Sequence, residues 1–239
     1  TSLPLVAGEK QSSSPVMKDM ISPMENTVYF LPNSDARQSQ IYFYIPMGDY
    51  NREENVRREA FNQYISGGFS GLIMNEIREK NSMAYTAYGF ASSRGLPGAQ
   101  TYFSGYIGTQ NDKAVDAIDL YMKLLTDMPE RPGRIDNIKS YLRQSALTDH
   151  PDSRNLSLRI AEWKRRGYTD DPAKEELPLI DSLTFPDIVD YYQKNIKGKP
   201  IIIGVLGNPK DISIDALKKF GKVIRLNEKK LFNEKDTMF

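Results

Sequence analysis

Two side chains able to polarise a carbonyl group, Arg78 and Tyr85, stand seven positions apart in the sequence. The polar stretch that follows Arg78 is expected to close a short helix, with Asn81 in the left-handed conformation at its end. A strand is expected to start near Met83 and to carry Tyr85. Such a helix-to-strand turn would bring a guanidinium and a phenol hydroxyl to one place. The alternative is that Arg78 is an exposed helix cation and Tyr85 a strand residue half in the core.

A glycine-rich turn precedes that helix, with three glycines in the five positions 67–71. Glycine allows a backbone to approach a ligand closely, and it is equally common in plain turns between helices. The sequence leaves both interpretations open. In the first, Gly67, Gly68, Phe69 and Ser70 present exposed backbone to a peptide, which makes these four residues candidates for substrate binding.

The composition is that of a soluble globular protein. Of the 239 residues, 39% are hydrophobic and 26% are charged, and the formal net charge is +1. This balance provides no electrostatic attraction for nucleic acid or for an anionic membrane surface. No apolar run approaches the ~20 residues that a membrane-spanning helix needs. We therefore expect no nucleic-acid partner and no membrane span in this segment.

Cysteine and histidine usage limits the possible chemistry. The chain has no cysteine and a single histidine, His150. Disulfides, thiol catalysis and cysteine-based zinc sites are thereby excluded. Catalytic zinc usually takes one or more histidines among three protein ligands, which a lone histidine in a turn-like segment does not provide. Phosphate-binding glycine motifs and the G-x-S-x-G motif are absent too. We expect no metal site in this chain.

Residues 1–25 are rich in Ser, Pro and Met without periodicity, which predicts a linker or an extended N-terminal segment. A peptide ligand or a docking arm is the alternative interpretation. The chain begins at Thr1, without the charged and apolar regions of a signal peptide. This start favours a segment of a longer protein, and it leaves the compartment of the parent protein open.

From residue 26 onward, local patterns predict regular structure. In 40–46, for example, Ile41, Phe43 and Ile45 alternate with two tyrosines, as in a strand with one buried face. Asn51 followed by Glu54 resembles a capping box at a helix start. The expected strands are 27–31, 40–46, 83–91, 101–108, 200–206 and 223–226. The expected helices are 52–65, a short one that buries Leu72, Met74 and Ile77, one from about 112, one over 135–146, one capped by Ser153 that buries Leu156, Ile160 and Trp163, and two more over 184–195 and 213–220.

The strands come in pairs, with helices clustered between them rather than in strict alternation. This order predicts an α+β fold. We expect a two-layer sandwich in which a mixed, mainly antiparallel sheet of about six strands has helices packed on one face. Residues 26–239 should form a single domain.

The segment GGFSGLIMNEIREKNSMAY, at 67–85, resembles a family pattern. The pattern is GG-x-x-S-x-L-x-x-x-x-R-x-x-x-x-x-A-Y of the pitrilysin/insulinase zinc metallopeptidases, which include the mitochondrial processing peptidases. Gly71 stands where the pattern usually has Ser. The likeness extends from about Thr27 to Leu226 through the order and spacing of several further stretches.

That resemblance implies a clamshell of two related α+β halves around a peptide, with zinc held by H-x-x-E-H in one half. The corresponding helix here, 52–65, has no histidine. The chain is therefore similar to the C-terminal, non-zinc half. By the same resemblance, Tyr85 would donate a hydrogen bond to the oxyanion that develops at the scissile carbonyl, and Arg78 would hold a neighbouring substrate carbonyl.

The implied function is the substrate-binding half of a zinc-dependent endopeptidase that degrades or processes peptides. Zinc is expected in an N-terminal partner half, on the same polypeptide or on a separate subunit, and this segment alone is expected to be inactive. The alternative within the family is a non-catalytic structural or peptide-binding homologue. An unrelated α+β binding module is a third possibility. An H-x-x-E-H motif in the parent gene or its neighbour would favour the first.

Overall fold

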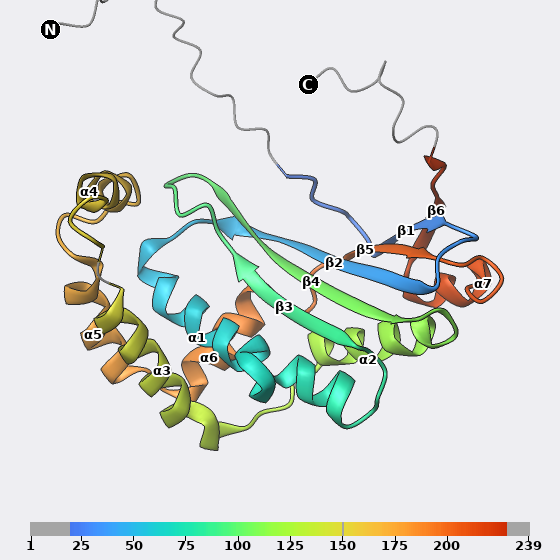
Figure 1. Cartoon of the computed structure of the whole chain (residues 1–239), viewed down its shortest axis with the longest axis horizontal. Coiled ribbons are helices and arrows are strands. Elements are labelled where there is room, and N and C mark those ends of the chain that lie inside the picture. The colour runs from blue at the N-terminus through green and yellow to red at the C-terminus, as the bar shows by residue number, and fades with distance from the viewer. Residues whose placement is uncertain (1–19, 150, 229–239) are drawn as a thin grey trace, which may run out of the picture.

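The computed structural model describes residues 20–149 and 151–228, and of Phe69 only the backbone. His150 and residues 1–19 of the expected linker lie outside the described residues. The described chain forms a layer of strands and a layer of helices (Figure 1). The strands are β1 Thr27–Pro32, β2 Gln38–Asp49, β3 Thr86–Ser92, β4 Gln100–Gln110, β5 Ile202–Gly207 and β6 Lys222–Arg225.

The strands form one mixed sheet in the order β3-β4-β2-β5-β1-β6. Antiparallel pairing joins β3 to β4, β4 to β2 and β2 to β5, whereas β1 pairs in parallel with β5 and β6. The expected α+β class, with a mixed and mainly antiparallel sheet, is confirmed. Every expected strand is present, with ends that differ from the expected ones by at most three residues.

Helices cover one face of this sheet. Helix α1 packs against β3 and α2 against β2 and β4, while α3, α5 and α6 pack around α1. In Figure 1 these helices lie together on the lower side of the sheet. The helices are α1 Asn55–Ser66, α2 Ala114–Thr126, α3 Ile135–Thr148, α4 Leu156–Arg165, α5 Pro172–Ser182, α6 Phe185–Asn195 and α7 Ile214–Leu217.

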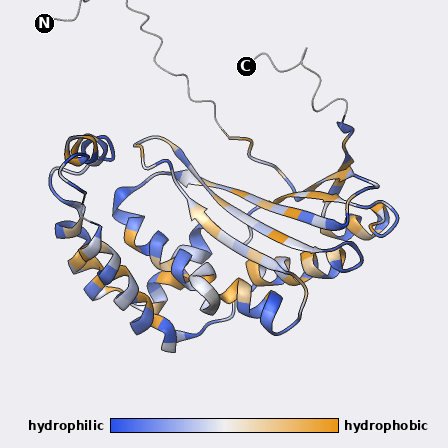
Figure 2. Ribbon diagram, in the orientation of Figure 1, coloured by the Kyte–Doolittle hydropathy of each residue, from blue (hydrophilic) through white to orange (hydrophobic). Residues whose placement is uncertain are grey.

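The alternation of side chains in β2 separates the core from the open face of the sheet. Ile41, Phe43 and Ile45 are buried against the helices, because successive side chains of a strand point to opposite faces. Figure 2 shows hydrophobic residues interspersed with hydrophilic ones along the strands. The open face carries an aromatic cluster whose paired rings lie 5.1–6.0 Å apart. Its members are Tyr42, Tyr44, Tyr88, Phe90, Tyr102 and Tyr106.

Tyr121 joins α2 to the sheet. Its ring stacks on Phe43 with centroids 4.0 Å apart, and its hydroxyl donates to the Tyr88 carbonyl at 2.9 Å. Complete burial raises the pKa of this hydroxyl well above its usual value. Gly89 and Gly105 face each other across β3 and β4, and a Cβ there would come within 2.3 and 2.1 Å of the hydroxyl. The two glycines therefore make room for α2 beneath the β3–β4 hairpin.

The start of α1 lies where the sequence predicts it but differs in detail. The Asn51 side chain accepts a hydrogen bond from the Glu53 N–H at 2.9 Å, and a 3-10 turn, Arg52–Glu54, precedes the α-helix. The expected capping box is incomplete, because the Glu54 carboxylate pairs instead with Lys194 of α6. The buried residues of α1 are Val56, Ala60, Phe61, Tyr64 and Ile65, as expected.

The short helix after the glycine-rich turn is wound more loosely than expected. Residues Met74–Glu79 form a π-helix, in which each N–H bonds five residues back. The looser winding changes which side chains face the core. Leu72, Ile73 and Ile77 are fully buried, whereas Met74, which we expected in the core, is only half-buried.

Two helices depart from the sequence prediction. Helix α5 is absent from the sequence prediction, and Pro178 within it removes a backbone hydrogen bond. It forms because Asp171 caps its start by accepting from the Ala173 N–H at 2.9 Å, with Pro172 in the first helical turn, and because it packs on α3. Helix α4 was expected to bury an apolar stripe from a start at Ser153. It begins at Leu156 and buries none of its residues.

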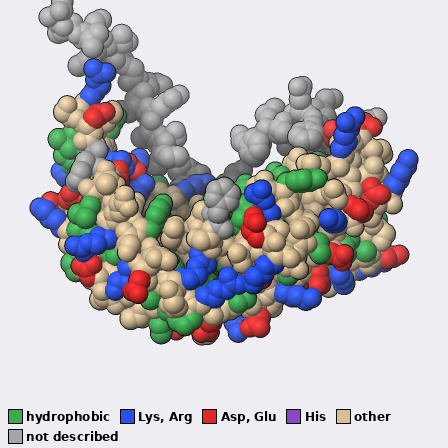
Figure 3. All heavy atoms as spheres, turned by 60° about the horizontal axis from the view of Figure 1, so that its bottom comes forward, with side chains coloured by type: hydrophobic (Ala, Val, Ile, Leu, Met, Phe, Trp, Pro, Cys, Tyr) green, Lys and Arg blue, Asp and Glu red, His purple; other side chains and the backbone are tan. Residues whose placement is uncertain are grey.

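Charged side chains are spread over the helical side of the molecule. Figure 3 shows Lys and Arg interspersed with Asp and Glu over much of this surface. The pattern agrees with the formal net charge of +1. None of the helices in the described ranges combines the length and the apolar character needed to cross a bilayer.

Candidate functional site

Arg78 and Tyr85 flank the turn that links the π-helix to β3. The strand begins at Thr86, so the expected start near Met83 is wrong and Tyr85 stands one residue before the strand. The Tyr85 N–H nonetheless donates to the Gly108 carbonyl of β4 at 3.0 Å. This bond fixes the Tyr85 backbone to the sheet. Because the chain bends at Tyr85, its side chain does not follow the alternation of exposed and buried side chains along β3.

The turn itself is closed by two polar residues. Ser82 adopts the left-handed conformation, with φ of 50°. The Asn81 side chain donates to the Glu76 carbonyl at 2.7 Å. The expectation of a left-handed Asn81 is therefore wrong, because its amide group satisfies a helix carbonyl directly and the next residue makes the reversal.

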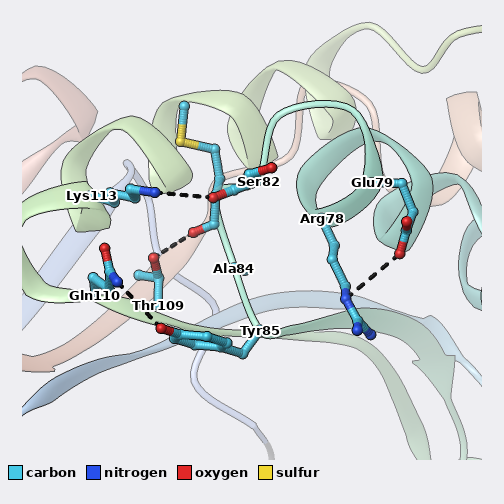
Figure 4. A pocket seen from close by; sticks show the side chains of 9 residues that line it. Arg78, Glu79, Ser82, Ala84, Tyr85, Thr109, Gln110 and Lys113 are labelled. Carbon is cyan, nitrogen blue, oxygen red and sulfur yellow. Dashed lines mark hydrogen bonds and ion pairs between the residues drawn. The ribbon is translucent and has the colours of Figure 1, made fainter.

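Both candidate side chains line one pocket of about 360 Å³ that opens to solvent (Figure 4). The pocket lies between the π-helix, the turn and the end of β4. Figure 4 shows the Tyr85 ring pointing toward Gln110 rather than toward Arg78. The lining residues are Arg78, Glu79, Ser82, Met83, Ala84, Tyr85, Thr109, Gln110 and Lys113.

The Arg78 guanidinium is only loosely held. Its Nε lies 3.6 Å from the Glu79 carboxylate, and the two side chains are 44% and 53% exposed. Ion pairs as exposed as this one contribute little to stability. The guanidinium can therefore exchange its carboxylate contact for another hydrogen-bond acceptor at small cost.

Tyr85 is 57% exposed, although aromatic side chains usually bury most of their surface. Its hydroxyl oxygen accepts a hydrogen bond from the Gln110 side-chain amide at 3.2 Å. The phenol hydroxyl of Tyr85 is thus accessible for hydrogen bonding to a molecule in the pocket.

Two further side chains at the end of β4 hold the backbone that carries Tyr85. The buried Thr109 hydroxyl donates to the Met83 carbonyl, and the Lys113 ammonium donates to the Ser82 carbonyl at 3.3 Å. Sequence reasoning did not identify Thr109, Gln110 or Lys113 as site residues. The expected hairpin of 83–91 with 101–108 contained the necessary signal, because the residues that follow 108 must lie opposite those at the start of the paired strand.

Gly67, Gly68 and Ser70 of the glycine-rich turn are not among the residues that line this pocket. Of the candidate substrate-binding residues, Gly68, Phe69 and Ser70 form a 3-10 turn, and Gly67 precedes it. Ser70 donates to the Gly67 carbonyl at 3.2 Å. The role of these four residues in substrate binding stays a prediction.

Backbone conformation accounts for one glycine of the turn and backbone packing for another. Gly68 has φ of 57°, a conformation that L-residues with side chains rarely adopt. At Gly71 a Cβ would lie 2.7 Å from the Ser66 Cα. The departure from the family pattern at Gly71 thus has a steric reason, since this backbone leaves no room for a serine side chain.

The described residues do not fit a zinc site. They contain no group of three or more His, Cys, Asp or Glu side chains placed to hold a metal ion. The helix α1 has no histidine.

Comparison with known proteins identifies the family. A family model described as the peptidase M16 inactive domain matches residues 10–132, which is more than half of the 239-residue chain. The chain belongs to the peptidase M16 inactive domain family. A search of curated proteins finds no match to the chain.

Solved structures share the fold of this M16 inactive domain. The peptidase M16 inactive domain from Pseudomonas fluorescens superposes with a TM-score of 0.65 at 15% identity, covering 81% of this chain and 47% of that one. The periplasmic protease PqqL from Escherichia coli gives 0.62 at 16% identity, covering 87% and 22%. A chain of Complex III2 from Candida albicans gives 0.59 at 13% identity, covering 79% and 47%. This M16 inactive domain thus spans less than half the length of each of these chains.

Proposed function

We propose that this M16 inactive domain is the C-terminal, substrate-binding half of a zinc-dependent endopeptidase and completes the active site of a zinc-carrying partner half. The observation that carries the proposal is the open pocket in which Arg78 and Tyr85 both present exposed polar groups. The family match supports the placement of the chain in a peptidase family, whereas the choice of Arg78 and Tyr85 rests on the pocket that they line.

Tyr85 is proposed as the oxyanion donor. Attack of water on a scissile carbonyl turns the carbonyl oxygen into an oxyanion, and a donor already aimed at that oxygen lowers the barrier. The phenol meets this requirement, because its backbone is bonded to β4 and its oxygen is held by Gln110.

Arg78 is proposed to hold a neighbouring carbonyl of the bound peptide. Its weak pairing with Glu79 leaves N–H groups of the guanidinium available to donate to another acceptor. Such a contact acts on the bound substrate as well as on the transition state.

Zinc would be supplied by the partner half, where it would activate the attacking water. This chain contains one histidine and no cysteine, so its own contribution is confined to hydrogen bonding and to peptide positioning. The peptide itself and the partner half, whether on the same polypeptide or on a separate subunit, belong to this proposal.

The test is steady-state kinetics on a quenched peptide, with the chain combined with the zinc-carrying half of its parent protein. Tyr85→Phe should lower kcat by roughly 10²–10³ with little change in KM, because an oxyanion donor acts in the transition state. Arg78→Ala should also raise KM. Tyr141→Phe is a matched control, since Tyr141 is 53% exposed on α3, away from this pocket. If Tyr85→Phe left kcat within a factor of two, the proposal would fail.

A non-catalytic role within the family is the second candidate. The observation that favours it is the shared fold with a chain of Complex III2 from Candida albicans. On this alternative the pocket binds peptide or protein without cleavage. Peptide binding by the assembled protein without any turnover, together with a parent gene that lacks H-x-x-E-H, would support it over the peptidase.

A further inference from the structure

Gln110 is the last residue of β4, and its side-chain amide lies against the hydroxyl of Tyr85 (Figure 4). The nitrogen to oxygen distance is 3.2 Å. An amide nitrogen can only donate, so the phenol oxygen is the acceptor in this bond. The hydrogen of the phenol is therefore left free to point into the pocket.

The sheet register brings the two residues together. Thr86 pairs with Gly108 across β3 and β4, so the residues just before β3 lie opposite those just after Gly108. The Tyr85 N–H bonds the Gly108 carbonyl at 3.0 Å. The contact of Gln110 with Tyr85 is thus set by the backbone hydrogen bonds of the hairpin.

The end of β4 and the turn after it also hold the residues that precede Tyr85. The Thr109 hydroxyl donates to the Met83 carbonyl and Lys113 donates to the Ser82 carbonyl. The Ser82 carbonyl, the Met83 carbonyl and the Tyr85 N–H are thus all hydrogen-bonded to residues within 108–113. With the backbone so restrained, the freedom left to Tyr85 is the rotation of its ring and of its hydroxyl.

We propose that Gln110 is a positioning residue for Tyr85. Its amide limits the ring to one orientation and occupies the phenol oxygen, so that the phenol hydrogen is directed at the substrate. A hydrogen bond donated to the phenol oxygen also polarises the O–H bond and makes it a stronger donor. This inference rests on the proposed function, because it needs Tyr85 to act on a peptide carbonyl.

The test replaces Gln110 by side chains that differ in whether they donate or accept a hydrogen bond, and it measures kcat and KM of the chain assembled with its zinc-carrying half. Gln110→Glu has nearly the same shape, but its carboxylate only accepts and would capture the phenol hydrogen. It should lower kcat by about tenfold or more, as expected for partial loss of an oxyanion donor, with little change in KM. Gln110→Lys keeps a donor and should retain most of kcat. Gln110→Ala should lower kcat by a smaller factor than Gln110→Glu, because water can donate to the phenol oxygen but does not restrain the ring.

Two controls separate positioning from a general effect of charge. Gln38→Glu places the same charge on β2 at the position paired with Gln110, and it should leave kcat unchanged. In a Tyr85→Phe background, Gln110→Glu should have no further effect on kcat, since the group through which it acts is gone. Melting curves of every variant report whether the fold is intact.

The outcomes are distinct. If Tyr85→Phe lowers kcat but Gln110→Glu does not, the proposed function stands and the role of Gln110 is refuted. If Gln110→Glu lowers kcat equally with and without the Tyr85 hydroxyl, the effect is direct and the positioning role is again refuted. If Tyr85→Phe is without effect, both proposals fail together.

Discussion

At the scale of single residues, the site depends on one buried hydroxyl as much as on the two exposed groups. Thr109 is 1% exposed, and its hydroxyl donates to the Met83 carbonyl two residues before Tyr85. Thr101, at the other end of the same strand, makes a similar bond to the Gly48 carbonyl at 2.6 Å and is 7% exposed. The two threonines therefore form a natural pair, one beside the pocket and one remote from it.

Thr109→Val should destabilise the fold by about 1–3 kcal/mol, because the substitution leaves the Met83 carbonyl without its buried donor. In the assembled enzyme it should also lower kcat, since the segment leading to Tyr85 loses one of its restraints. Thr101→Val should cost similar stability and leave kcat unchanged. The measurements are urea unfolding and peptide kinetics; equal kinetic effects of the two substitutions would contradict a local role for Thr109.

At the scale of elements, the Asp187 carboxylate links the start of α6 to α1. Asp187 accepts hydrogen bonds from the Thr184 N–H at 2.9 Å and from the Thr184 hydroxyl at 2.6 Å, and it pairs with Arg57 of α1 at 2.9 Å. Partial burial alone would raise the pKa of Asp187. The hydrogen bonds from Thr184 and the charge of Arg57 outweigh this and lower the pKa below the ordinary value of 3.8. The sequence Thr184 to Asp187 predicted this helix start, which the structure confirms.

This carboxylate should make stability depend on pH. Because the folded pKa is depressed, the contribution is fully present above the ordinary value of 3.8 and is lost as the pH falls through the lower folded value. Asp187→Asn should therefore destabilise the chain by about 1 kcal/mol at pH 7, as for loss of a helix cap, and by much less near pH 2. Urea unfolding at both pH values measures the difference.

Asp190→Asn is the matched control on the same helix, since the Asp190 side chain is exposed. It should change stability little at either pH. A destabilisation by Asp187→Asn that is the same at pH 7 and pH 2 would contradict the role given to the charged carboxylate.

At the scale of the whole molecule, two groups of apolar side chains are exposed among the residues that the structure describes. One is the aromatic face of the sheet, where Tyr42 is 50% and Phe90 40% exposed; the other is α4, where Leu158 is 70% exposed. Monomeric proteins seldom expose apolar side chains in such groups without a partner. On the function proposed above, these surfaces are candidates for contact with the partner half.

The isolated chain should neither bind zinc stoichiometrically nor cleave peptides. The reason is its donor set, which contains a single histidine and no cysteine. Metal analysis after dialysis and a quenched-peptide assay test both statements. One tightly held zinc per chain, or turnover that persists in the absence of any zinc-carrying half, would contradict the proposal that zinc is bound by the partner half alone.

Local structure could be predicted largely from the sequence, because its causes are local. The alternation of Ile41, Phe43 and Ile45, the helix starts at Asn51 and Thr184, and the pairing of strands with clustered helices all depend on neighbours in the chain. The candidate pair Arg78 and Tyr85 was also available from the sequence, since their turn lies within a single short segment.

Only the tertiary structure decided how distant segments meet. The parallel pairing of β1 with β5 joins residues 27–32 to 202–207, and no local pattern encodes a contact of that separation. Packing on α3 stabilises α5 despite Pro178. The geometry of the π-helix buries Ile73 rather than Met74 in the core. The same holds for the site. Gln110 contacts Tyr85 because two antiparallel strands fix their register through backbone hydrogen bonds, and that register forms only when the strands are brought together.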